Sequence, residues 1–153
     1  MDKLPEVETA KALMTEAMQW SVMKWLREKK KVRQSADRAN AALDRLSETV
    51  KGRWNNGMKA AYDVLVAQAA SGPSADRQKK QPLPVADPEA ALIARKVKEA
   101  DDAAYRARMD AEKTFDDAER QLSTSLAREG CRKAIHGWEL HEKAIRKAEA
   151  IIQ

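Results

Sequence analysis

The sequence predicts an all-α protein, folded as a long antiparallel helical hairpin or coiled coil. Its 153 residues are 35% charged and only 5% aromatic, with five glycines and five prolines, a profile typical of long helices. Apolar residues recur at helical spacing in both halves of the chain. We therefore expect one helical domain over residues 1–153, in which arms at 5–70 and 88–152 are joined by a proline-rich loop at 71–88.

The first arm carries a sustained apolar seam. Its members follow one another at alternating steps of three and four residues, which is the heptad spacing of packed helices. They are Met18, Val22, Trp25, Lys29, Val32, Ala36, Ala39, Leu43, Leu46 and Val50, of which only Lys29 is polar. A second consecutive step of four leads from Val50 to Trp54. Such a stutter beside glycines makes a helix break near Gly52–Gly57 possible.

The loop is bounded by a helix stop and a helix start. Gly72 is followed by Pro73, and this pair ends helices because glycine accepts the left-handed cap and proline cannot continue the helix. Asp87 precedes Pro88, and this pair starts helices because aspartate caps free N–H groups and proline fits the first helical position. We therefore expect the second arm to begin at Pro88.

The second arm contains two seams that differ in phase. The first consists mostly of small residues, namely Ile93, Val97, Ala100, Ala104, Ala107, Ala111, Thr114 and Ala118. The second comprises Cys131, Ala134, Trp138, His141, Ile145, Ala148 and Ile152. Gly130 lies between the two seams and is the expected point of interruption.

Two packings of these arms are compatible with the seams. In the hairpin, a turn in the middle of the loop places Leu43 and Leu46 opposite Thr114, so that large side chains meet small ones. The alternative is a compact four-helix bundle of unequal helices, with breaks near Gly52–Gly57 and Gly130.

Residues able to support catalysis or metal binding are few and poorly spaced. His136 and His141 stand five positions apart, so on a helix they do not form the usual i, i+4 metal-binding pair. The single cysteine, Cys131, is either a packed thiol of the seam or a reactive thiol beside Arg132 and Lys133. The sequence has no glycine-rich phosphate loop. We therefore expect no enzymatic activity, no cofactor and no small-molecule substrate.

A second apolar patch is expected at the open end of the hairpin. On a helical wheel, Trp20 and Met23 point away from the seam of the first arm, and basic side chains share this outer face. Leu140 and Ile151 likewise lie outside the seam of the second arm. The expected patch consists of Leu13, Trp20, Met23, Lys24, Arg27, Lys31, Leu140 and Ile151. Exposed tryptophan and methionine in one patch usually mark an interaction site.

These observations favour a non-enzymatic scaffold or adaptor that acts through protein–protein contacts and self-associates, most simply as a homodimer. A different protein partner at the same face is the second possibility. The third is an anionic lipid surface or a nucleic acid, bound through the basic amphipathic segment 13–33. The phosphate contacts would then come from Lys29, Lys30, Lys31 and Arg33. The sequence has no apolar run of transmembrane length and no signal-peptide core, so a cytoplasmic location is expected.

Overall fold

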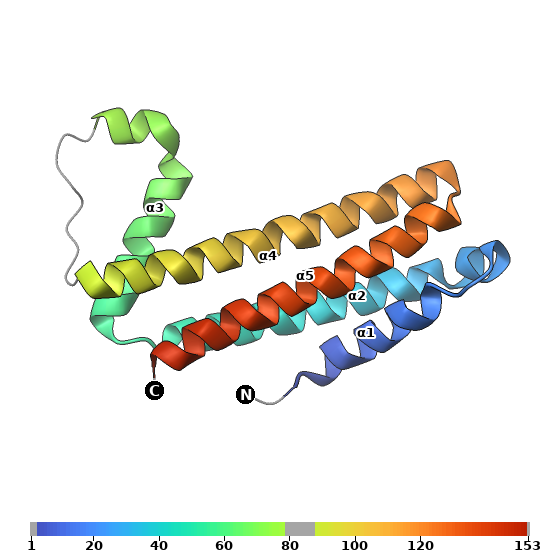
Figure 1. Cartoon of the computed structure of the whole chain (residues 1–153), viewed down its shortest axis with the longest axis horizontal. Helices are drawn as coiled ribbons and strands as arrows, with labels where there is room; N and C mark the ends of the chain where they lie inside the picture. The colour runs from blue at the N-terminus through green and yellow to red at the C-terminus, as the bar shows by residue number, and fades with distance from the viewer. Residues whose placement is uncertain (1–2, 79–87, 153) are drawn as a thin grey trace.

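The chain is an assembly of α-helices, which confirms the fold class that the sequence predicts. The computed structural model describes residues 3–78 and 88–152, and within these ranges it contains five helices and no strand. The helices are α1 (Pro5–Ala17), α2 (Val22–Gly52), α3 (Asn56–Gln78), α4 (Pro88–Gln121) and α5 (Thr124–Ile151). The three long helices α2, α4 and α5 give the molecule its elongated shape (Figure 1).

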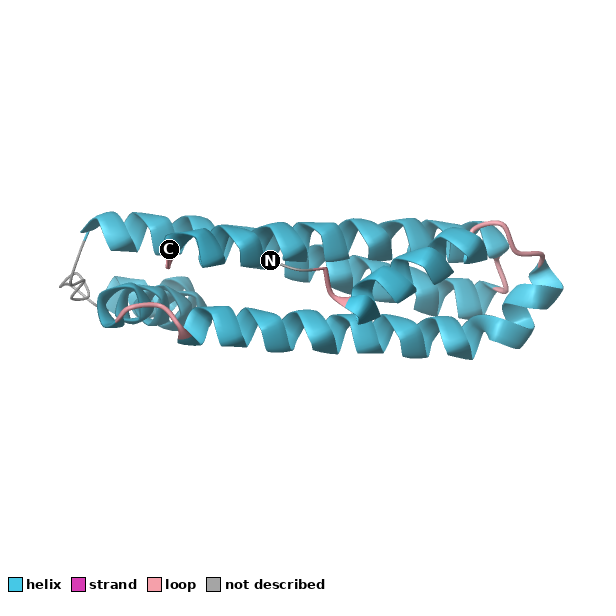
Figure 2. Cartoon of the chain, turned by 90° about the horizontal axis from the view of Figure 1, so that it is seen from below, coloured by secondary structure: helices cyan, strands magenta, loops and turns pink. Residues whose placement is uncertain are grey.

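Four of the helices form a bundle, and α3 leaves it. α4 and α5 are antiparallel neighbours joined by a short turn, and α2 packs along another side of α5. α1 folds back onto α2 and α5. Seen from below, these helices run along one axis of the bundle (Figure 2). α3 packs against α4 at the end of the bundle where α4 begins, and it then projects away from the bundle (Figure 1).

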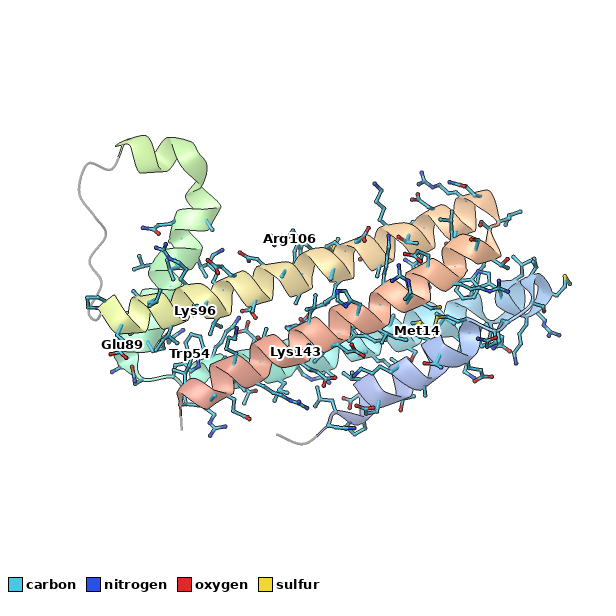
Figure 3. All side chains as sticks on the ribbon, in the orientation of Figure 1. Met14, Trp54, Glu89, Lys96, Arg106 and Lys143 are labelled. Atoms are coloured by element: carbon cyan, nitrogen blue, oxygen red, sulfur yellow. The ribbon has the colours of Figure 1, made fainter. Side chains whose placement is uncertain are left out.

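The core is apolar and lies along the inner faces of the bundle helices. Its largest fully buried side chains include Trp138, Met14, Leu43, Ile145 and Val32. Met14 points from α1 into the bundle, and Trp54 lies beside the last turns of α5 (Figure 3). Trp138 Nε1 donates to Asn40 Oδ1 over 2.8 Å, and Trp54 Nε1 donates to the carbonyl oxygen of Ala148 over 3.1 Å. These two bonds hold α2 and the turn that follows it against α5.

The predicted seams account for most of this core. In the last helix the buried members are Cys131, Ala134, Trp138, His141, Ile145 and Ala148, as predicted. In α2 the buried members of the seam are Trp25, Val32, Ala39, Leu43 and Val50. The seam fails at its N-terminal end, where Val22 is 48% exposed.

Serine-capped turns interrupt both arms at positions where the sequence suggested no break. At the start of α2, Ser21 Oγ accepts a hydrogen bond from Lys24 N over 3.2 Å. At the start of α5, Ser123 Oγ accepts one from Leu126 N, also over 3.2 Å. Each cap satisfies a free N–H group of the helix that follows.

The second arm therefore folds back on itself, and α4 packs on α5 rather than on a continuous first arm. Thr114 of α4 accepts a hydrogen bond from Lys133 Nζ of α5 over 3.1 Å. The expected hairpin register, with Leu43 and Leu46 opposite Thr114, is accordingly wrong.

Of the two glycine breaks that the sequence suggests, only the first is found. α2 ends at Gly52 and α3 begins at Asn56, which confirms the break near Gly52–Gly57. Gly130 lies inside α5, buried against Phe115 of α4, so the break expected there is wrong. Its lack of a side chain serves the close approach of α4 and α5 instead.

The predicted loop also differs from the structure at its first boundary. The helix stop expected at Gly72–Pro73 is wrong, because α3 continues to Gln78. The helix start at Pro88 is confirmed, since α4 begins there. The rest of the predicted loop, residues 79–87, lies outside the described residues.

Candidate functional site

A groove runs between α2 and α4, and α5 forms its floor. α4 packs against α5 and α3, whereas α2 packs against α1 and α5. Three hollows follow one another along this α2–α4 groove, from the end with the serine-capped turns to the end where α3 lies. Their volumes are about 10, 40 and 270 Å³ in that order. The groove is therefore shallow and closed at one end and open at the other.

In the middle of the groove, two aromatic rings support an ion-paired arginine. Trp25 of α2 and Phe115 of α4 stack with their ring centroids 6.1 Å apart and their planes inclined by 11°. The guanidinium of Arg33 lies 5.6 Å from the centroid of the Phe115 ring. Its nitrogens are 3.0 Å from Asp116 Oδ1 and 3.4 Å from Glu119 Oε1. Charge pairs as well as rings thus connect α2 to α4 across the groove.

The largest of the three hollows in the groove, which we call the polar hollow, lies between α2, α3, α4 and α5. Lys51 Nζ is 2.5 Å from Asp101 Oδ2, and it donates to the hydroxyl of Tyr62, which in turn donates to Asp101 over 3.0 Å. Burial lowers the pKa of Lys51, but the bonds to Asp101 and Tyr62 outweigh it and raise the pKa above its ordinary value. Burial raises the pKa of Tyr62. Lys51 is therefore protonated, and the three groups tie α2, α3 and α4 together.

His141 contributes to the wall of the polar hollow from α5. Arg108 Nη1 lies 3.2 Å from His141 Nδ1 and 2.7 Å from Asp44 Oδ1. Because a guanidinium only donates, Nδ1 is the acceptor and the ring proton of neutral His141 is on Nε2. Burial, with a contribution from the positive charge of Arg108, lowers the pKa of His141 below its ordinary value of 6.5. His141 is thus neutral at pH 7.

At the other end of the groove, large apolar side chains surround the smallest hollow. Val22 and Leu26 come from the first turns of α2, and Leu122 comes from the turn between α4 and α5. These side chains are 48%, 39% and 68% exposed, and Met23 next to them is 68% exposed. We call these four residues the tip patch. Both turns that carry it lie at the same end of the bundle (Figure 1).

Leu122 also has an unfavourable backbone conformation. Its φ of 51° makes it the one non-glycine residue with positive φ in the described part of the chain. The left-handed region costs a leucine about 1–2 kcal/mol, because its Cβ crowds the backbone. Such strained residues concentrate at functional sites, where the strain is retained for a reason other than stability.

Most of the predicted self-association patch is covered within the chain. Trp20 is only 6% exposed, and its ring lies 6.2 Å from that of Trp25 and 5.3 Å from Lys24 Nζ. The partly buried members are Leu13, Lys24, Leu140 and Ile151. Met23 is the exposed apolar member. The expectation that Trp20 faces outward is wrong, because the chain turns at residues 18–21 and α1 packs back on the bundle.

The predicted phosphate-binding residues all lie on α2, but they are not all exposed. The exposed ones are Lys30 and Lys31. Lys29 is partly buried at the tip patch, Arg33 pairs with α4, and Lys24 Nζ lies 3.6 Å from Glu16 of α1. The segment 13–33 is not a continuous amphipathic helix, because the first serine-capped turn divides it.

The histidines and the cysteine do not come together. His136 is exposed, whereas His141 is 7% exposed and bound to Arg108. Cys131 is fully buried, and burial raises the pKa of its thiol to about 12, so it is a packed thiol rather than a reactive one. Within the described ranges, no three His, Cys, Asp or Glu residues are placed to hold a metal ion. No helix in those ranges has both the length and the apolar character to cross a bilayer.

Two parts of this site were missed by reasoning from the sequence. Leu26 and Leu122 were assigned neither to the seam nor to the predicted patch. The signals that mark the turns beside them are Ser21 and Ser123, which are ordinary N-cap residues. The contact of Arg108 with His141 joins residues 33 positions apart, and helical periodicity carries no signal for it. The site thus depends on where the helices turn.

We find no protein-family model, no curated protein and no solved structure that matches this chain. The function is therefore inferred from the geometry and the charges of the α2–α4 groove.

Proposed function

We propose that this protein is a non-enzymatic helical scaffold that associates with a second copy of itself through the tip patch. The observation that supports this proposal most is Leu122, which is 68% exposed and has a φ of 51°. Glycine or asparagine would suit this backbone better, and a polar side chain would suit its exposure. Contact with a partner offsets both costs, because it removes the leucine side chain from water.

The arrangement of the tip patch suits a symmetric contact. Val22 and Leu26 are one helical turn apart on α2, and together with Leu122 they line a single hollow. A twofold axis near this hollow brings the same residues of both copies together, as in most homodimers. Met23, beside Val22, extends the apolar surface toward the rim.

The charges around the tip patch favour a second copy over a phosphate-bearing partner. Basic residues follow the patch on α2 and acidic residues precede it on α4. They are Lys29, Lys30 and Lys31 on α2 and Asp116, Asp117 and Glu119 on α4. Within the chain, Asp116 and Glu119 pair with Arg33 and Asp117 pairs with Arg120, yet all three carboxylates stay at least partly exposed. The lysines of a second copy can therefore extend these pairs into a charge network, which gives electrostatic complementarity. A lipid or nucleic-acid surface would meet the acidic stretch as well, and like charges repel.

Light scattering of the full chain over a range of concentrations tests this proposal. We expect a dimer whose mass falls toward that of the monomer on dilution. The double variant Val22→Glu, Leu26→Glu should remain monomeric with an unchanged helical circular dichroism spectrum, because both side chains are already exposed. The matched control is Leu92→Glu, since Leu92 is 54% exposed at the start of α4, away from the tip patch.

Two results would contradict the proposal. A wild-type chain that stays monomeric at high concentration excludes self-association. A dimer that Leu92→Glu disrupts as much as the double variant places the contact elsewhere. The competing phosphate-binding function has its own signature, namely wild-type binding to anionic vesicles or nucleic acid that falls steeply with salt and is lost in Lys30→Glu, Lys31→Glu.

A further inference from the structure

The turn between α1 and α2 is made without the residues that break helices. The turn covers residues 18–21, and the whole stretch 6–51 contains neither glycine nor proline. Methionine and glutamine, at positions 18 and 19, are good helix formers. The heptad spacing also runs through the turn, from Met18 to Val22 and Trp25. The sequence of this turn is therefore compatible with one continuous helix from α1 into α2.

The folded-back arrangement of α1 has two costs at the turn. Trp20 is 6% exposed, and its buried Nε1–H has no acceptor in the described part of the chain. An unsatisfied buried donor destabilises the arrangement that buries it. In addition, Val22 is a member of the apolar seam but is left 48% exposed. Short hinges under strain are the places at which helices exchange between copies of a protein.

The contacts that hold α1 on the bundle are ones that a second copy reproduces without change. α1 packs on α2 and α5, and Met14 is fully buried there. Lys11 Nζ lies 3.3 Å from Glu142 Oε1 of α5. Arg45 Nη2 of α2 lies 3.4 Å from Glu6 Oε2. An identical bundle offers the same buried surface and the same charges, so exchange of α1 keeps these contacts and changes only the hinge.

The position of the hinge matches the twofold contact proposed for the tip patch. Val22 and Met23 follow the turn directly, at the end of the bundle where the chain folds back (Figure 1). When α1 continues the axis of α2, it extends past this end, where the bundle of a second copy lies in a tip-to-tip dimer. Each α1 then lies antiparallel to α2 of the other copy, as it lies against its own α2 in the single chain.

We infer that α1 exchanges between the two copies of the dimer. In the exchanged form α1 and α2 are one continuous helix, and α1 of each copy packs on α2 and α5 of the other. The inference rests on the proposed self-association, because exchange requires a dimer. It adds a second contact surface to the tip patch, namely the faces of α2 and α5 that α1 covers in the single chain.

Two charge-reversed variants of the full chain, refolded together from urea, test the exchange. Lys11→Glu and Glu142→Lys each place like charges at this pair within one chain, whereas an exchanged heterodimer has opposite charges at both places. Native mass spectrometry, with one variant isotope-labelled, should show heterodimers about threefold to tenfold above the statistical ratio. The matched control is Lys59→Glu with Asp63→Lys. These two residues pair within α3, so a second copy cannot restore the pair.

A second pair of variants repeats the test at the surface, where the change does not put folding at risk. Glu6→Arg and Arg45→Glu reverse charges whose side chains are 38% and 70% exposed. Their mixture should also contain heterodimers above the statistical ratio, because α1 of one copy meets α2 of the other.

The cap at the hinge gives an independent measurement. Ser21 Oγ caps the start of α2, and a continuous helix has no start at this position and needs no cap. Ser21→Ala therefore destabilises the folded-back chain alone, and it should lower the dissociation constant of the dimer about tenfold. Ser123→Ala is the matched control. It removes the cap of the other turn, which the exchange leaves unchanged, so the dissociation constant should stay as in the wild type.

The outcomes separate the exchange from the dimer itself. Heterodimers at the statistical ratio for both pairs of variants, when the wild type dimerises, overturn the exchange and leave the tip patch as the contact. A dissociation constant that Ser21→Ala does not lower, or that Ser123→Ala lowers equally, also overturns the exchange. A wild-type chain that stays monomeric overturns both proposals.

Discussion

The ring of Phe115 in α4 lies directly against the backbone of Gly130 in α5. A Cβ added to Gly130 would lie 2.8 Å from Phe115 Cδ1 and 2.9 Å from Cε1, closer than a carbon–carbon contact permits. The ring has little freedom to retreat, because Trp25 stacks on it and Arg33 lies over it. Gly130 therefore fixes how closely α4 and α5 approach each other.

Gly130→Ala should destabilise the fold by about 1–3 kcal/mol, the usual cost of overpacking. Urea denaturation followed by tryptophan fluorescence measures this directly. Gly52→Ala is the control, because a Cβ at Gly52 meets nothing within 4 Å and alanine is the better helix former by up to about 1 kcal/mol. If the two variants are equally stable, the close contact between Phe115 and Gly130 does not exist.

The hydrogen bond from Trp138 to Asn40 makes a second stability prediction. Trp138 is 1% exposed, so Asn40→Ala leaves its indole N–H buried without an acceptor. We expect a loss of about 1–3 kcal/mol in the free energy of unfolding. Asn40→Asp, which keeps an acceptor oxygen, should lose less. A loss that is the same in both variants would mean that packing at position 40, and not the bond, matters.

His141 should make the fold less stable as the pH falls below 6.5. Its pKa is lowered in the folded state, chiefly by burial and then by Arg108, so between that lowered value and 6.5 the unfolded chain binds more protons than the folded one. Stability is then fully present above 6.5 and is lost at up to about 1.4 kcal/mol per pH unit below it.

Urea denaturation at pH 7.5 and at about pH 5.5 tests the role of His141. The loss of stability at the lower pH should be smaller in His141→Gln than in the wild type. His136→Gln should behave as the wild type does, because His136 is exposed. The account of His141 is refuted by a pH dependence that survives His141→Gln unchanged.

Helical periodicity predicted much of the core of α2, α4 and α5, but it missed Val7 and Met14 of α1, Phe115 of α4 and the points at which the chain turns. The burial of Trp25, Val32 and Leu43 follows from their heptad spacing. The same spacing continues from Met18 to Val22 across the first turn, so the apolar pattern hid that turn. The local evidence for it was Ser21, an N-cap residue that a reading based on seams alone overlooks.

Because the turns were missed, the candidate site was predicted in the wrong place. Trp20 was expected to face outward on a continuous helix, whereas the turn beside it and the packing of α1 bury it. The same turns expose Val22 and Leu122 at one end of the bundle. Placing these residues requires knowledge of the tertiary fold, since Val22 and Leu122 are 100 positions apart in the chain.

The most direct test of the proposed scaffold is the variant Leu122→Asn, assayed for both stability and association. Asparagine tolerates the left-handed backbone, so at concentrations where the chain is monomeric the variant should be more stable than the wild type by about 1 kcal/mol. At high concentration, light scattering should show a dimer for the wild type and a monomer for Leu122→Asn, because the variant loses the apolar side chain of the tip patch. A variant that dimerises as tightly as the wild type would contradict the assignment of the tip patch as the contact between two copies.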